Sequence, residues 1–280
     1  MLDIDFYAKK YFYWDKPCIY KKGNHEITIY PIKLEDSEEF LNASSVLSID
    51  KDSLASVDII QMSYLSFIVK VLFKQNKTYI EYLSYILKKC LDIDDPKIGM
   101  DSHNKKMIFD DDKDIFITEK EFEDVRRLIL YQNILSYDDS YIDPDLKNAI
   151  METNRLRNRD IDFPDVERRM AIITSHCGLT KEYQQNMTYR AHSKLFKEIC
   201  GDIDFNTTRS IALLNGKDLE HWIYKKKKDK YSDYIMTLED YNKSMGGDGN
   251  VADGKIRASK NMPTDGAALD AMYNMHVNSK

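Results

Sequence analysis

The sequence predicts a mainly α-helical protein with a small β component (α+β). Apolar residues recur at helical spacing over most of the chain, whereas short runs of β-branched and aromatic residues occur only in the first half. Five of the ten glycines follow Met245. We therefore expect an N-terminal α+β domain over residues 1–135, a helical domain over 136–244 and a Gly-rich flexible tail over 245–280.

The N-terminal part predicts a strand followed by helices. ITIYPI (27–32) is rich in β-branched and aromatic residues and predicts a strand. A helix follows over EEFLNASSVLS, capped by Asp36 or Ser37. The next two stretches, SVDIIQMSYLSFIVKVLF (56–73) and KTYIEYLSYILKKCL (77–91), each predict one helix, and the first of them is largely buried.

The middle of the chain predicts a β-hairpin and a capped helix. In KKMIFDDDKDIFITEKEF (105–122), the runs MIF and IFI flank an Asp-rich turn. Thr118 then caps a helix that continues to about Asn133. Asp and Pro recur over residues 136–144, which we take as the domain boundary.

Helices are expected throughout the chain after Pro144. Pro near the start and Gly just past the end mark them: PDLKNAIMETNRLRN, then PDVERRMAIITSHC ending at Gly178, then MTYRAHSKLFKEIC ending at Gly201. A further helix over DFNTTRSIALL ends at Leu214. Within the tail, we expect one short helix near GAALDAMYNM.

Composition weighs against several classes of protein. The chain has 41 Lys and Arg against 47 Asp and Glu, a net charge of −6, which disfavours a protein built to bind nucleic acid. The proportions of hydrophobic residues (42%) and charged residues (31%) fit neither a disordered chain nor a membrane protein. The longest apolar run, from Tyr64 to Phe73, is too short to cross a bilayer, and the acidic N-terminus is unlike a signal peptide. We expect a cytoplasmic protein without membrane association.

One stretch matches part of a calcium-loop pattern. DDDKDIFITEKE places Asp110, Asp112, Asp114 and Glu121 at the first, third, fifth and twelfth positions of that loop. The sixth position requires Gly for a sharp turn, but it holds Ile115, inside the second predicted strand of the hairpin. We therefore expect no calcium and no other metal.

No motif predicts catalysis. His176 lies next to Cys177, but adjacent residues of a helix point about 100° apart and do not form a nucleophile with its base. The chain has no nucleophile-elbow motif and no Gly-rich phosphate-binding loop. Its four cysteines lie far apart, as is typical of reduced structural thiols. We predict a non-enzymatic protein without a cofactor.

A helix-turn-helix is an alternative for MAIITSHCGLTKEYQQNMTYRAHSKLF (170–196). The outline of helix, Gly-containing turn and polar segment fits a DNA-binding motif. Gly178 is equally well a helix C-cap, Thr188 interrupts the second segment, and basic residues do not gather there. A DNA-binding regulator is therefore the least favoured reading.

The most conspicuous charge run is Lys225–Lys228, which follows His221 and Trp222. From Lys217 to Asp233, however, six lysines meet four acidic residues and leave a local charge of only +2. Phosphate binding along a nucleic acid requires a more extended basic surface. We expect solvated lysines beside an amphipathic anchor that includes Trp222.

Two long stretches resemble a known family. The first is FYWDKPCIYKKGNHEITIYPIKLEDSEEFLNASSVLSIDKDS with DIIQMSYLSFIVKVLF, and the second runs from MTYRAHSKLFKEIC through IALLNGKDLEHWIYKKKKDKYSDYIMTLEDYNKSM. They resemble phage proteins of Gram-positive hosts that are encoded among tail genes and are similar to tail assembly chaperones or baseplate hub assembly proteins of contractile-tailed phages. The resemblance covers roughly residues 6–245 in order, including EFEDVRRLILYQN and VERRMAIITSHCGLT.

The resemblance also gives a role to the segment around the lysine run. In similar proteins, the counterpart of LLNGKDLEHWIYKKKKDKYSD is a hydrophobic segment, a short polar turn, a His-Trp pair and a Lys-Asp-Lys-Tyr stretch. This match implies that His221 and Trp222 belong to a structural element of the family. Residues after Met245 lie outside the resemblance.

The function implied by the resemblance is non-enzymatic assembly of the phage tail or baseplate through protein contacts. The expected partners are other tail or baseplate proteins, with self-association as a further option, in the host cytoplasm during assembly. A permanent structural component of the virion is the main alternative. Besides His221 and Trp222, the predicted partner-binding residues lie in the amphipathic stretch LDAMYNM of the tail: Leu269, Met272 and Tyr273.

Overall fold

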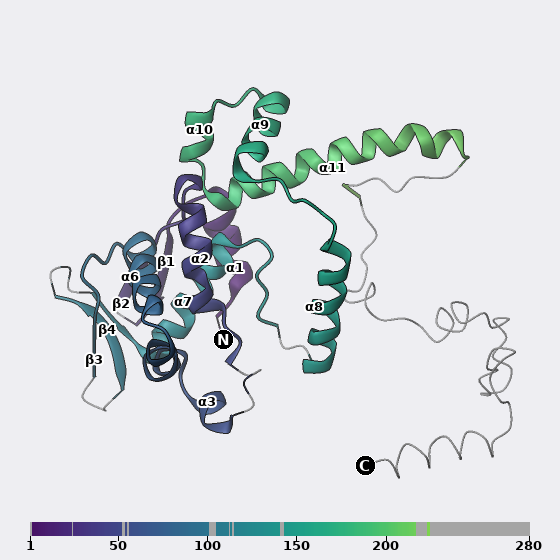
Figure 1. Cartoon of the computed structure of the whole chain (residues 1–280). Helices are drawn as coiled ribbons and strands as arrows, with labels where there is room; N and C mark the ends of the chain where they lie inside the picture. Colours follow the sequence, from purple (N-terminus) through teal and green to yellow (C-terminus); the bar gives the residue numbers. More distant parts are fainter. Residues whose placement is uncertain are drawn as a thin grey trace, which may run out of the picture. The chain divides into compact units, whose positions relative to one another are not determined.

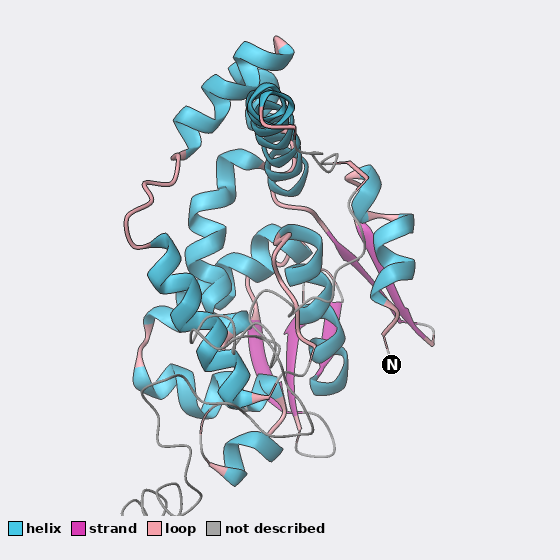
Figure 2. Ribbon diagram, turned by 90° about the vertical axis from the view of Figure 1, so that its right-hand side faces the viewer, coloured by secondary structure: helices cyan, strands magenta, loops and turns pink. Residues whose placement is uncertain are grey.

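The computed structural model describes residues 2–216, apart from 24, 52–53, 55, 101–104, 112, 114 and 141–142, together with 223–224. The chain divides into two compact units, Met1–Pro144 with Asp162–Tyr224 and Asp145–Ile161 with Lys225–Lys280. Helices prevail among the described residues, and the strands form two small antiparallel sheets (Figure 1, Figure 2). This arrangement confirms the predicted fold class, whereas the domain limits expected after residues 135 and 244 remain a prediction.

Three short helical elements of the first unit were not predicted. They are α1 (Ile4–Lys10) and the 3₁₀ turns η1 (Phe12–Trp14) and η2 (Leu34–Asp36). Asp3 caps α1, because its carboxylate accepts a backbone N–H of the first turn. Asp15 ends η1 in the left-handed region with a φ of 54°, a conformation that Asp tolerates better than most residues.

A hairpin of β1 (Cys18–Lys22) and β2 (His25–Ile29) forms the first sheet. Side chains alternate between its faces, and each strand buries two residues. The predicted strand at 27–32 overlaps β2 but extends too far. Strand pairing stops at Ile29 because Tyr30 donates its N–H to a carbonyl outside the sheet and Pro31 has no N–H.

The second sheet has three strands in the order β3 (Lys97–Met100), β4 (Lys106–Asp110) and β5 (Ile115–Thr118). Strands β4 and β5 confirm the predicted hairpin. Strand β3 was missed because its four residues include Gly99 and follow an Asp-rich link. The ring of Phe109 lies across Gly99 so closely that a Cβ there would be 2.8 Å from it, which explains why Gly suits this strand.

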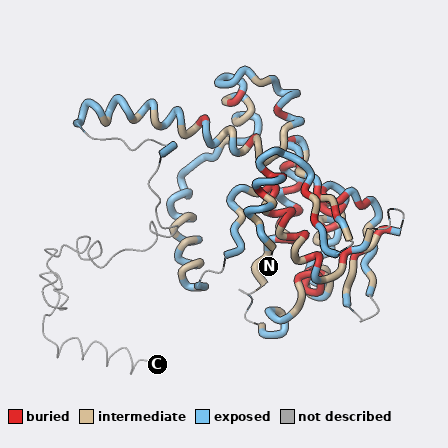
Figure 3. Tube along the Cα trace, turned by 180° about the vertical axis from the view of Figure 1, so that it is seen from behind, coloured by how far each residue is buried: buried red, intermediate tan, exposed pale blue. Residues whose placement is uncertain are grey.

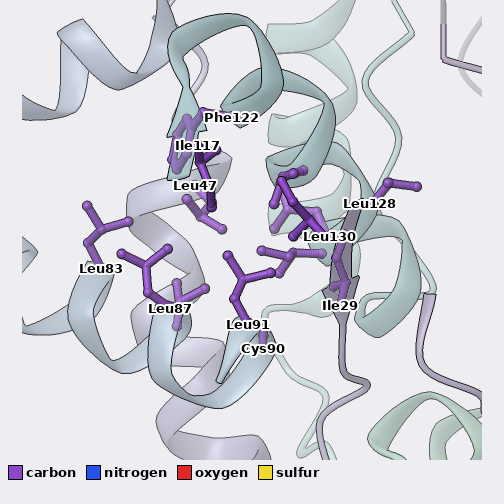
Figure 4. Packing of buried hydrophobic residues seen from close by; sticks show 14 of the residues in the cluster. Ile29, Leu47, Leu83, Leu87, Cys90, Leu91, Ile117, Phe122, Leu128 and Leu130 are labelled. Atoms are coloured by element: carbon purple, nitrogen blue, oxygen red, sulfur yellow. The ribbon is translucent and has the colours of Figure 1, made fainter. Parts of the chain in front are cut away.

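The core lies among α2 (Ser37–Ser48), α6 (Thr78–Leu91), α7 (Glu119–Asn133) and the two sheets. All three helices confirm the sequence prediction, but the side-chain cap expected for α2 does not form: Asp36 occupies the N-cap position without a capping hydrogen bond, and the hydroxyl of Ser37 donates to the carbonyl of Leu34. Thr118 forms the predicted cap of α7 as part of a capping box with Glu121. Figure 4 shows buried side chains that meet from these elements, including Ile29, Leu47, Leu87, Leu91, Ile117, Phe122, Leu128 and Leu130.

The single helix predicted over 56–73 was wrong. The chain instead forms α3 (Val57–Gln61), α4 (Tyr64–Phe67), one π-helical turn η4 (Ile68–Leu72) and α5 (Phe73–Gln75). The break precedes α4, where Ser63 adopts an extended backbone and its hydroxyl accepts the N–H three residues on. A serine in that position starts a new helix, although apolar spacing continues across the break.

Three helices close the first unit: α9 (Val166–Cys177), α10 (Lys181–Asn186) and α11 (Tyr189–Leu214). Gly178 ends α9 with a φ of 69°, as predicted. The helix end predicted at Gly201 was wrong. Helix α11 is 26 residues long and continues through Gly201 to Leu214. A glycine inside a helix costs only about 1 kcal/mol, which the hydrogen bonds and packing of a long helix offset.

Helix α8 (Pro144–Asn158) lies almost wholly in the second unit. It confirms the predicted helix and begins at Pro144, a residue suited to the first helical position. Arg155 near its end pairs with Glu152 at 2.8 Å. Neither α8 nor any other helix among the described residues is long and apolar enough to cross a membrane.

Candidate interaction surface

The partner-binding residues predicted from the sequence fall outside the described part of the chain. They are His221, Trp222, Leu269, Met272 and Tyr273. The lysine run that begins at Lys225 also lies outside it. These assignments therefore stay predictions, and the candidate surface comes from residues that the structure does describe.

Helix α11 is fastened at its start to the N-terminal segment. Thr188 caps the helix: its Oγ1 accepts the N–H of Ala191 at 3.1 Å and donates to the carboxylate of Asp15. The N–H of Tyr189 donates to the carbonyl of Ile32 at 2.8 Å. These bonds connect residues far apart in sequence and fix the direction in which the helix leaves the core.

The first half of α11 packs on α9. Ile199 of α11 and Ile173 of α9 are buried, and the guanidinium of Arg169 lies 5.5 Å from the ring centroid of Phe196. His192 is also buried, and desolvation followed by the charge of Arg169 lowers its pKa. The imidazole is therefore neutral at pH 7, as suits a residue that completes this packing.

The second half of the helix, residues 201–214, is called here the outer half of α11. None of its residues is buried (Figure 3). Ile203, Ile211 and Leu214 continue the face that Ile199 begins, with exposed fractions of 41%, 58% and 88%. Solvent-exposed apolar residues that share one face of a helix are typical of a protein-binding surface.

Sequence reasoning missed this surface although its signal was present. The helix was expected to stop at Gly201, which separates Ile199 from Ile203. Spacings of four, eight and three residues connect Ile199, Ile203, Ile211 and Leu214, and these steps return to one side of a helix. Continuing the helical periodicity across the glycine would have revealed the face.

A pocket of about 290 Å³ lies between η1 and the first turns of α11. Its aromatic lining comes from Phe12 and Tyr13, and its cations come from Arg190 and Lys194. The guanidinium of Arg190 is 5.8 Å from the ring centroid of Phe12, and the ammonium of Lys194 is 5.8 Å from that of Tyr13. Sequence reasoning missed the pocket because η1 and α11 are distant in the chain.

Two carboxylates of the calcium-loop pattern, Asp110 and Glu121, lie in the described part of the chain and occupy different elements. Asp110 is buried in β4, and Glu121 is held in the capping box of α7, while Asp112 and Asp114 lie outside the described residues. Ile115 begins β5, as predicted. In the part of the chain that the structure describes, no group of three or more His, Cys, Asp or Glu residues is placed to hold a metal ion.

Glu121 instead connects the first sheet to α7. One carboxylate oxygen lies 3.0 Å from Nδ1 of His25, and the other accepts the N–H and hydroxyl of Thr118 at 3.0 and 2.7 Å. Burial alone would raise the pKa of Glu121, but the bonds from His25 and Thr118 outweigh it and lower the pKa below its ordinary value of 4.5. The ionised carboxylate therefore stabilises the fold above pH 4.5, the ordinary pKa, and this stabilisation is lost as the pH falls through the lowered pKa of the folded protein.

Replacing Glu121 by Gln is expected to reduce the free energy of unfolding by about 1–2 kcal/mol at pH 7. The difference from the wild type should shrink as the pH falls below 4.5 toward the lowered pKa of Glu121, because protonation then removes the stabilising charge from the wild type as well. Urea unfolding at pH 7, 5 and 3.5 measures both effects. Glu38→Gln, at an exposed position, should change stability by less than about 0.5 kcal/mol. A loss for Glu121→Gln that stays constant across this range would contradict the assigned role.

The segment with a helix-turn-helix outline forms three helices. Its second part is divided as predicted, because α10 ends at Asn186 and Thr188 caps α11. Gln184 of α10 is buried, and its Nε2 donates to the carbonyls of Met170 and Leu179 in the preceding helix and turn. Much of α10 therefore serves to close the turn after α9.

The outer half of α11 and the pocket at its start are the two candidate interaction sites of the described chain. Comparisons of the sequence and structure with protein-family models, curated proteins and solved structures give no match.

Proposed function

We propose that this protein is a non-enzymatic phage tail or baseplate assembly protein that acts by binding other tail proteins. The observation that carries the proposal is the outer half of α11, which presents Ile203, Ile211 and Leu214 to solvent along one face. Proteins commonly recognise an amphipathic helix by accepting the apolar residues of one face, at spacings such as three, four or seven residues, in a groove or against a second helix. A partner that covers this face would remove apolar surface from water.

The resemblance to phage tail proteins supplies the biological setting of this binding. It includes MTYRAHSKLFKEIC and IALLNGKDLEHWIY, the stretches that contain most of α11 and the residues that follow it. The proposed partners are other tail or baseplate proteins, met in the host cytoplasm during assembly. Under this proposal the helix and the segment after it act together as the part of the chain that partners recognise.

Replacing Ile211 and Leu214 together by Asp is expected to reduce capture of tail proteins from infected-cell lysate by at least about tenfold. Truncating or charging the central anchors of an interface typically costs 2 kcal/mol or more, which corresponds to such a change. The thermal unfolding midpoint should stay within about 2 °C of wild type, because neither residue is buried. Pull-down followed by quantitative mass spectrometry provides the measurement.

Arg209→Asp is the matched control. It changes the net charge by the same two units on the same helix but lies on the side opposite Ile211. Equal losses for the control and the double variant would attribute the effect to charge and contradict the proposed face. Quantitative proteomics of purified virions against lysate separates an assembly factor, which is depleted from finished particles, from a permanent virion component. DNA binding that is sequence-dependent and weakens steeply with salt would favour a regulator instead.

A further inference from the structure

The pocket beside η1 has an aromatic lining and exposed aromatic residues at its edge. Phe12 is buried behind it, whereas Tyr13 exposes 57% of its surface and the neighbouring Trp14 exposes 66%. Leu195 of α11 adds an aliphatic wall. Trp, Tyr and Arg are the residue types that dominate the energetics of protein interfaces, and Trp14, Tyr13 and Arg190 supply one of each here.

Two cations in this pocket, Arg190 and Lys194, form no ion pair with a carboxylate in the described part of the chain, although Asp15 lies near Arg190. Arg190 donates from Nη1 to the carbonyl of Tyr131 at 2.7 Å and makes no ion pair there. Arg190 is half-buried, and this desolvation lowers its pKa although Tyr13 and the carboxylate of Asp15 act in the opposite direction. Lys194 likewise makes no ion pair there, and its nearest aromatic partner is Tyr13. A partly desolvated, unpaired guanidinium favours an incoming anion.

The same pocket also has two acids, Asp15 and Glu198. Asp15 accepts a hydrogen bond from Thr188, and Glu198 lies one helical turn beyond Lys194. These carboxylates disfavour a polyanion such as a nucleic acid, but they are suitable acceptors for the backbone N–H groups of a peptide. The lining therefore matches a ligand that has both an anionic group and N–H donors.

We propose that this pocket binds an acidic peptide segment of a partner protein, in which a carboxylate lies next to an aromatic or large aliphatic side chain. The carboxylate pairs with Arg190 and Lys194, and the apolar side chain lies against Tyr13 and Leu195. A volume of about 290 Å³ is near the lower limit of small-molecule sites, which suits one or two side chains of a peptide. The site is separate from the outer half of α11 and does not depend on the proposed function.

A titration of the full-length protein with two synthetic peptides tests this site. The probes are the acetylated and amidated pentapeptides GDFDG and GNFNG, which differ only in charge. The readout is the amide NMR shift of residues 12–15 and 190–198, which flank the pocket. GDFDG should bind at least about tenfold more tightly than GNFNG, and its binding should weaken with added salt, because charge-assisted hydrogen bonds to Arg190 and Lys194 are lost with the carboxylates.

Two variants test whether Arg190 and Lys194 bind the carboxylates of the peptide. Arg190→Met should weaken GDFDG by about tenfold, and Lys194→Met by about threefold. Because Arg190 also bonds to the carbonyl of Tyr131, its variant is checked by thermal unfolding; Lys194 has no such bond and keeps the test valid if the first variant unfolds. Lys197→Met removes the same charge from an exposed position of α11 outside the pocket and should leave binding unchanged.

Several outcomes would overturn the proposal. They are equal binding of the two peptides, no shift with either peptide, an unaffected Lys194→Met variant, or shifts of the same amides by hexathymidylate but not by GDFDG. The double variant Ile211→Asp with Leu214→Asp should bind GDFDG normally, since neither residue lines the pocket. If tail-protein capture is lost while peptide binding is retained, the result therefore concerns the proposed function alone. If peptide binding is lost while capture is retained, the result concerns this site alone.

Discussion

Phe40→Ala is expected to lower the free energy of unfolding by about 3–5 kcal/mol. Phe40 lies on α2 with none of its surface exposed, in the cluster that joins α2 to α6 and α7. Removing its ring deletes apolar contacts and leaves a cavity among helices that are held in place by their other partners. A loss of this size is a large share of the total stability of a typical domain.

Urea unfolding followed by far-ultraviolet circular dichroism measures this loss. The adjacent Leu41 is 40% exposed, so Leu41→Ala should lower stability by less than about 1 kcal/mol. Helix propensity favours alanine in both variants, which leaves burial as the main difference between them. Similar losses at the two positions would mean that the face of α2 buried in the core has been assigned wrongly.

The second large effect is expected at Arg126, where replacement by Met should cost about 3 kcal/mol. The side chain is nearly buried; its Nη1 donates to the carbonyl of Leu47 at 2.7 Å, and its Nη2 bonds to Glu123 at 2.6 Å. The guanidinium also lies 4.0 Å from the ring centroid of Tyr64. The bond to Leu47 satisfies a carbonyl in the last turn of α2, where a positive charge also complements the helix dipole.

Tyr64 helps to cap the same helix end and provides the control. Its hydroxyl donates to the carbonyls of Val46 and Ile49 at 3.2 and 3.0 Å. Tyr64→Phe removes these bonds but keeps the ring, and should cost about 1 kcal/mol. Because the two side chains touch, a double-mutant cycle of Arg126→Met with Tyr64→Phe should give a coupling of at least about 0.5 kcal/mol. An Arg126→Met loss under about 1 kcal/mol would contradict the capping role.

The elements found correctly from the sequence are those whose local signals agree. In α7, apolar periodicity coincides with Thr118 and Glu121, which form its capping box. In α9, Gly178 follows the last periodic residue and adopts the left-handed conformation that ends the helix. Where two independent signals pointed to the same residue, the predicted helix limit was correct.

The errors arose where one signal dominated another. Apolar spacing predicted one continuous helix across Ser63. The side chain of Ser63 instead caps the start of α4, and the helix is broken at this residue. Glycine commonly follows the last residue of a helix, which favoured an end at Gly201. The residues on both sides are helical, however, and α11 already packs against α9 before the glycine. These conflicts are decided by tertiary packing, which a local rule does not contain.

The candidate sites were harder to predict than the fold. The outer half of α11 could have been found by continuing one periodic pattern. The pocket could not, because Phe12 and Arg190 are brought together by long-range contacts such as the bond of Thr188 to Asp15 and the bond of Tyr189 to Ile32. Such long-range pairings leave no local trace in a single sequence.

The bond between Asp15 and Thr188 also sets an order of events during synthesis. Its partners are 173 residues apart, so the contact cannot form until the start of α11 has left the ribosome. At about 5–20 residues per second, the N-terminal turn waits roughly 10–35 s for it. Throughout that interval Phe12 lacks Arg190 beside its ring, and the growing chain exposes apolar surface that the finished protein covers. Chaperones that bind nascent chains would therefore encounter the η1 residues that line the pocket before any partner of the finished protein does.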